Sequence, residues 1–163
     1  MPTNTSTAPG LCTGSLVLAA AGLLDGRPAT TPWLAQPVLR ALGADAHPDE
    51  RVVRDGRIAT AAGVSAGIDL ALWLVGDVFG AEQAQTAQLI IEYDPQPPYD
   101  AGHVGKASRA VRLAATAQQA RTMMEPANFG GFARLSAAVP QLAWRRAIGR
   151  MRERGKVLRR PAT

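Results

Sequence analysis

The chain has 163 residues, of which 47% are apolar and one is a cysteine. This length and apolar content fit one globular domain, and a single cysteine excludes an internal disulfide and favours a reducing cytoplasm. No apolar run approaches the roughly 20 residues of a transmembrane helix, so we expect no membrane partner. The net charge of +5 combines −6 over residues 1–102 with +11 over residues 103–163, which predicts a separate basic, Ala- and Arg-rich tail over 103–163.

The first predicted feature is a cysteine that precedes a helix. Residues 1–11 are rich in Thr, Ser, Pro and Gly without a strand pattern, so we expect a disordered N-terminus. Residues 13–24 predict a helix that ends at Gly26. Cys12 followed by small residues before a helix is typical of a nucleophile elbow, in which the helix N-terminus favours the thiolate. The alternative is that Cys12 is a small buried apolar residue.

A short strand over 27–31 and a helix over 33–42 come next. Pro37 falls inside this predicted helix and is compatible with it only in the first turn, so the helix would effectively start there. Pro32 lies at the end of the predicted strand and cannot donate a backbone hydrogen bond. We therefore expect an altered strand end at Pro32.

Residues 51–61 predict a β-hairpin whose turn contains an Asp-Gly pair. The small-residue loop 63–67 then leads into a predicted helix over 68–79. We interpret Ser65 as the cap of this helix and Asp69 as a first-turn acid. The alternative is that the glycines of the loop allow close approach of the backbone to a substrate.

The last predicted elements are a helix over 81–93 and a proline-rich surface strap over 94–99. His47 and His103 are isolated loop histidines without ligand spacing, so we expect no metal site. Residues 142–160 predict a basic amphipathic helix, with Trp144, Ile148 and Met151 on one face. Such a helix is typical of a nucleic-acid contact, and the alternative is a tail without a selected role.

Three sequence blocks carry a resemblance to a known family. They read CTGSLVLAAAGLLDGRPATT, DERVVRDGRIATAAGVSAGIDLALWLV and QLIIEYDPQPPYDAG, in this order between Cys12 and Gly102. They resemble the ThiJ/PfpI superfamily of class I glutamine amidotransferase-like folds, and within it the isonitrile hydratase branch. The resemblance implies an α/β, flavodoxin-like three-layer sandwich, of which residues 12–102 would be the C-terminal half. We therefore expect a truncated domain followed by a helical or disordered basic tail.

The resemblance also implies a site. Cys12 would be the catalytic nucleophile, the Thr13 hydroxyl would position water or substrate, and the backbone N–H at Gly14 would stabilise developing negative charge. The substrate would be an isonitrile, hydrated to an N-substituted formamide, or a reactive carbonyl compound, and no cofactor is implied. Thr13 stands where PfpI-type peptidases carry a histidine, and Pro32 stands where the family usually has the histidine of TTHW.

The same resemblance implies what the chain lacks. The acidic residue that handles protons beside the cysteine comes from the N-terminal half in this family, and no residue of this chain corresponds to it. We therefore expect impaired activity and association, either as a homodimer or with the missing half. The alternative function is a non-catalytic remnant that acts as an association module.

Overall fold

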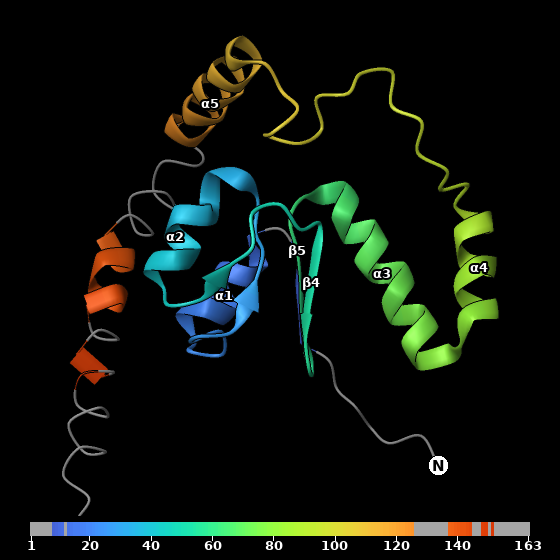
Figure 1. Cartoon of the computed structure of the whole chain (residues 1–163), viewed down its shortest axis with the longest axis horizontal. Helices are drawn as coiled ribbons and strands as arrows, with labels where there is room; N and C mark the ends of the chain where they lie inside the picture. The colour runs from blue at the N-terminus through green and yellow to red at the C-terminus, as the bar shows by residue number, and fades with distance from the viewer. Residues whose placement is uncertain (1–7, 12, 126–136, 145–147, 150, 152–163) are drawn as a thin grey trace, which may run out of the picture.

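The computed structural model describes residues 8–11, 13–125, 137–144, 148–149 and 151. Figure 1 shows the arrangement of its elements. In chain order they are β1 (Ala8–Leu11), α1 (Gly14–Ala20), β2 (Pro28–Ala29), the 3-10 helix η1 (Trp33–Ala35), α2 (Gln36–Ala41), β3 (Asp45–Ala46), β4 (Val52–Asp55), β5 (Ile58–Ala61), α3 (Val64–Phe79), α4 (Ala81–Ile90) and α5 (Arg109–Met124).

The described strands form two small sheets. β5 lies between β1 and β4, parallel to β1 and antiparallel to β4, and β2 pairs with β3 in parallel. Parallel neighbours need a crossover connection, which α2 provides between β2 and β3. α1 and α2 lie on one side of the three-stranded sheet and α3 with α4 on the other (Figure 1). The predicted α/β class with three layers is confirmed.

β5 is the centre of the core because all four of its residues are buried. Ile58 joins a cluster with leucines of α1, α2 and the turns that follow them, and Ala59 and Ala61 join Ala66 and Leu70 of α3 in a second cluster. Successive side chains of a strand point to opposite faces. The two clusters therefore lie on opposite faces of β5, and burial of both explains why this strand shows no apolar–polar alternation.

β1 corrects the expectation of a disordered segment over residues 1–11, since Ala8–Leu11 form a strand paired with β5. Residues 1–7 lie outside the described part of the chain. Gly10 is buried, and a Cβ built on it would lie 2.9 Å from Leu18 Cδ1 and 3.1 Å from Ser15 Cα. A small residue is required because α1 packs directly on the strand, and such residues carry little strand propensity.

α1 is shorter than predicted and ends at Ala20. Gly22 has φ 86°, the Gly22 N–H donates to the Ala19 carbonyl, and the Leu23 N–H donates to the Leu18 carbonyl. These two bonds form a Schellman motif with Gly22 in the left-handed position. The expected end at Gly26 is therefore wrong, although Gly26 also has a positive φ, of 69°, in the turn that follows.

The interpretation of Pro37 is confirmed, because α2 begins at Gln36 and Pro37 lies in its first turn. Two residues separate Pro32 from the end of β2, and Pro32 has φ −52° and ψ 143°, so the ladder ends before it. The hairpin of β4 and β5 is also confirmed. Its two loop residues are Gly56, with φ 59°, and Arg57, one position later than expected.

The described parts of the tail after residue 108 are mainly helical. α5 is exposed along its length, and residues 137–144 form a further helical segment in which Leu142 packs against the cluster around α1 and α2. Trp144 and Met151 of the predicted apolar face are exposed. The rest of the predicted helix over 142–160 lies outside the described residues. Within the described part of the chain, no helix has the length and apolarity to cross a membrane.

We expect Gly10→Ala to lower the free energy of unfolding by about 1–3 kcal/mol, the usual cost of an added methyl group in a packed core. Gly14→Ala is the matched control, because no atom lies within 4 Å of a Cβ built there. Urea denaturation of both variants measures the difference. Equal stability of the two variants would contradict the close packing of α1 on β1.

Candidate active site

The carboxyl ends of β1 and β5 meet at one edge of the sheet. The two strands are parallel and Leu11 is paired with Ala61, which also pairs with Val52 at the start of β4. Each of β1 and β5 continues through a short turn into a helix, α1 after Thr13 and α3 after Gly63. Ligands bind outside the carboxyl ends of parallel strands in many α/β proteins, so this edge is the candidate site.

Thr13 and Gly14 of the predicted elbow follow β1 at this edge. Cys12 is outside the described residues, but the strand before it and the helix after it have the strand–turn–helix order that an elbow requires. Thr13 is exposed and is the N-cap of α1, and its carbonyl accepts a hydrogen bond from the Leu16 N–H at 3.0 Å. Gly14 is half-buried. The closest packing near this turn is between Gly10 of β1 and Ser15 and Leu18 of α1. We did not single out Gly10 from the sequence.

A polar cluster, formed by Arg51, Ser65, Asp69 and Tyr93, lies beside the turn before α3. The Arg51 Nε and Nη2 atoms donate to Asp69 Oδ2 at 2.9 and 2.5 Å, and Arg51 Nη2 lies 3.4 Å from Ser65 Oγ. The Tyr93 hydroxyl donates to Asp69 Oδ1 at 2.6 Å. The Ala62 N–H also donates to the Arg51 carbonyl at 2.9 Å. These bonds join the residue before β4, helix α3 and the turn after α4 at the edge of the sheet that carries the elbow.

The cluster holds Asp69 in its charged form. Partial burial acts to raise the pKa of Asp69, but hydrogen bonds from Tyr93 and Arg51 and the Arg51 charge together hold this pKa below its usual value. The hydrogen bond to Asp69, with desolvation, raises the pKa of Tyr93 above its usual value. The tyrosine therefore remains a neutral donor to a carboxylate at neutral pH.

This cluster corrects the interpretation of Ser65 and Asp69. α3 begins at Val64, one position before Ser65, its N-cap is Gly63, and its first turn contains no acidic residue. Ser65 and Asp69 lie four residues apart on one helix face, and both bind Arg51. The i, i+4 spacing was visible in the sequence, but the partners before β4 and after α4 depend on the tertiary fold.

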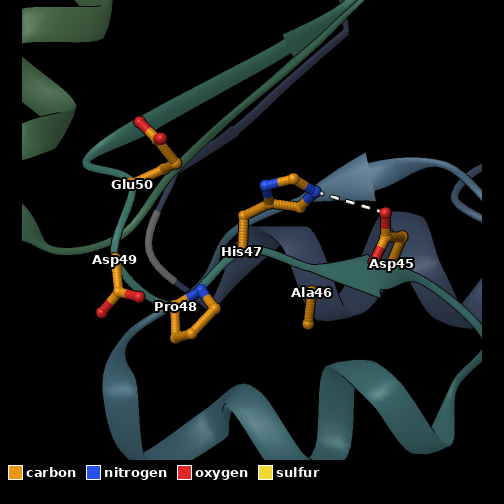
Figure 2. A pocket seen from close by; sticks show the side chains of 6 residues that line it. All are labelled: Asp45, Ala46, His47, Pro48, Asp49 and Glu50. Carbon is orange, nitrogen blue, oxygen red and sulfur yellow. Dashed lines mark hydrogen bonds and ion pairs between the residues drawn. The ribbon is translucent and has the colours of Figure 1, made fainter.

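The connection from β3 to β4 lines a shallow depression of about 300 Å³, formed by Asp45, Ala46, His47, Pro48, Asp49 and Glu50 (Figure 2). His47 Nε2 lies 3.3 Å from Asp45 Oδ2, and His103 Nε2 lies 3.7 Å from Asp49 Oδ1. All six lining residues come from one continuous segment, and none comes from α1 or α3. The depression is therefore not a pocket built around the elbow.

Buried polar groups follow β2. The Thr30 N–H donates to Thr60 Oγ1 at 2.9 Å, and Gln36 Nε2 donates to the Thr31 carbonyl at 2.7 Å. The first bond attaches the chain after β2 to the middle of the central strand, and the second attaches the start of α2 to the same segment. Among the residues that the structure describes, no three His, Cys, Asp or Glu side chains are grouped to hold a metal ion.

Comparison with known proteins gives a family match for the first part of the chain. The sequence profile of the DJ-1/PfpI family matches residues 4–76. Isonitrile hydratase of Pseudomonas putida is 52% identical over 101 residues, which cover 62% of this chain and 44% of that protein. The HTH-type transcriptional regulator CdhR of Pseudomonas aeruginosa is 41% identical over 86 residues, covering 50% of this chain and 24% of the regulator. The resemblance noted in the sequence is confirmed.

A solved structure agrees with the fold. The crystal structure of a ThiJ/PfpI family protein from Pseudomonas syringae aligns with a TM-score of 0.64 and 42% identity. The alignment covers 71% of this chain and 47% of that protein. The chain thus spans less than half the length of each of these three relatives.

We expect Asp69→Asn to lower the free energy of unfolding at pH 7 by about 1–2 kcal/mol, because Arg51 and Tyr93 lose a charged acceptor that is partly exposed. Since folding lowers the pKa of Asp69, its contribution to stability is present above about pH 4 and is lost as the pH falls through the folded-state pKa. Denaturation at a series of pH values should show the two proteins converging in acid.

Asp77→Asn is the control, because Asp77 is an exposed aspartate on the same helix. A difference between wild type and Asp69→Asn that persists unchanged at pH 2.5, roughly 1.5 units below an ordinary aspartate pKa, would contradict the role of the charge.

Proposed function

Because residues 4–76 of this chain match the sequence profile of the DJ-1/PfpI family, we propose that the chain carries the nucleophile-bearing part of an isonitrile hydratase site. The 52% identity with the Pseudomonas putida enzyme over 101 residues is the observation that supports this choice. The chain spans 44% of that enzyme, so the activity of the whole protein is part of the proposal.

In the proposed reaction the Cys12 thiolate adds to the terminal carbon of an isonitrile, R–N≡C. A proton adds to the same carbon, which gives the thioimidate R–N=CH–S–Cys12. Water then adds to the thioimidate carbon and the thiol leaves, so the product is the formamide R–NH–CHO. The two steps balance without a metal or an organic cofactor, and the covalent intermediate divides one difficult addition into two easier ones.

The residues after the cysteine have supporting roles in this proposal. The exposed Thr13 side chain makes no hydrogen bond that caps α1, so its hydroxyl is available to orient water or substrate. The backbone N–H groups at Thr13 and Gly14 would stabilise the negative charge that develops on addition. The resemblance assigns the proton donor to an acidic residue in the other half of such a domain.

The paired strand ends also support the proposal. The register of β1 with β5 brings the turn at Ala62 and Gly63 beside the elbow, and no atom lies within 4 Å of a Cβ built on Gly63. Space on this side of the turn suits the approach of a small molecule. The neighbouring cluster around Asp69 would hold the turn in place.

A second candidate function is a non-catalytic association module. The observation that favours it is the apolar surface of α4, where Leu89 and Ile90 are exposed although both are large and aliphatic. Exposed apolar residues that lie together mark interaction sites in soluble proteins. Activity measurements separate the two candidates, because the module needs no reactive cysteine.

We expect the chain to convert cyclohexyl isocyanide to N-cyclohexylformamide when mixed with the part of the Pseudomonas putida enzyme that lies outside the 101-residue match. Cys12→Ala should lower the rate by roughly a thousandfold or more, because the nucleophile acts as a unit with its neighbours. Chromatography with mass detection measures the formamide, and Asp77→Asn should leave the rate unchanged. Equal rates for wild type and Cys12→Ala would rule out the proposed mechanism.

We also expect the thiol of Cys12 to titrate below the ordinary value of about 8.5, because the elbow places it at a helix start. The rate of iodoacetamide alkylation as a function of pH measures this, and Cys12 is the single cysteine of the chain, so the adduct is unambiguous. Gly10→Ala should move the titration toward the ordinary value by displacing α1 from β1. An apparent pKa at or above 8.5 in the wild-type chain would mean that the elbow does not activate the thiol.

A further inference from the structure

The outward face of α4 has no partner in the described structure. Ala84 and Ala87 are half-buried, and Ala84 Cβ lies 3.5 Å from a Cβ built on Gly76 of α3, so these alanines mark the side that faces α3. At about 100° per residue, Glu82 and Leu89 fall on the opposite side of the helix. Leu89 is 78% exposed, and its neighbour Ile90 is 76% exposed.

α5 carries a complementary apolar stripe. Leu113, Ala117, Ala120 and Met124 are spaced i, i+4, i+7 and i+11, which places them along one face of the helix. Leu113 is 62% exposed and Met124 is 60% exposed. α5 is about 24 Å long and α4 about 15 Å, at 1.5 Å per residue, so α5 can cover α4 from end to end.

The two segments that carry these surfaces have charges of opposite sign. Residues 58–105 contain six acidic side chains and no Lys or Arg, whereas α5 contains three arginines and no acidic residue. Arg112 and Arg121 fall on opposite sides of the apolar stripe, and Glu82 lies in the outward face of α4. An apolar centre with charged flanks is the usual composition of a protein–protein contact.

We propose that the outward face of α4 binds α5 of a second copy of this chain. The contact would place the Leu113 stripe against Leu89 and Ile90, with the arginines of α5 near the carboxylates of the α3–α4 hairpin. Each copy offers both surfaces, so a pair of chains forms the contact twice. Forming the contact twice doubles the buried area, and stable interfaces bury roughly 1,200–2,000 Å².

The route of the chain favours a second copy over the same copy. After α4 the strap crosses to the far side of the molecule, where α5 lies away from α4 (Figure 1). His103 Nε2 is 3.7 Å from Asp49 Oδ1, and the Arg112 guanidinium donates to the Val104 carbonyl at 3.4 Å. α5 begins six residues after His103, so the contact of His103 with Asp49 limits how far the start of α5 can move from that side of the molecule.

Sedimentation velocity of the full chain over a range of concentrations tests the proposal. We expect association in the wild type, and Leu89→Glu or Leu113→Glu should each weaken it at least tenfold. Both residues are exposed, so the variants should fold, which circular dichroism checks. Tyr99→Glu is the matched control, because Tyr99 is 81% exposed in the strap outside both surfaces, and it should associate like the wild type.

Mixing the two variants identifies the pairing. The Leu113→Glu chain retains an intact α4 and the Leu89→Glu chain retains an intact α5, so their mixture should form one of the two contacts and recover a heterodimer. A wild-type chain that stays monomeric at all concentrations would overturn the proposal. So would association that both variants leave unchanged, or two variants that remain monomeric when mixed.

Discussion

The parallel pairing of β1 with β5 is the contact on which the rest of the arrangement depends. It sets the register that brings the end of β1 beside the end of β5, and so brings the start of α1 beside the start of α3. The pairing tolerates α1 directly above it because Gly10 has no side chain. A reactive group at position 12 would thus be positioned by a packing contact two residues earlier in the chain.

The second constraint is the burial of β5 on both faces. Ile58 packs toward α1 and α2, whereas Ala59 and Ala61 pack toward α3. The strand therefore contributes residues to both core clusters. Thr60 stays buried because its hydroxyl accepts the Thr30 N–H. A polar residue in this strand is thereby satisfied, and it fixes the position of the chain that follows β2.

The sequence predicted the elements that are determined by interactions within a few residues. The Asp-Gly turn of the hairpin and the proline in the first turn of α2 act within a few residues, and both were found close to their predicted places. β1 was missed because its residues are small, and small residues do not form a strand pattern in the sequence. They are small because α1 packs directly on the strand, and this contact is visible only in the tertiary fold. The role of Asp69 was missed for a similar reason, since Arg51 and Tyr93 reach it from 18 and 24 residues away.

The hydrogen bond from the Tyr93 hydroxyl to Asp69 fastens the chain after α4 to α3. A ten-residue helix exposed on most of its surface is only marginally stable by itself, and Glu92, with φ 48°, adds strain where the chain leaves α4. The Tyr93–Asp69 bond opposes fraying at the C-terminal end of α4. The turn at Gly80 and the contact between Gly76 and Ala84 hold the N-terminal end of α4 against α3. In amide hydrogen exchange, α4 would then open together with α3 as one cooperative unit, although its own residues are exposed to water.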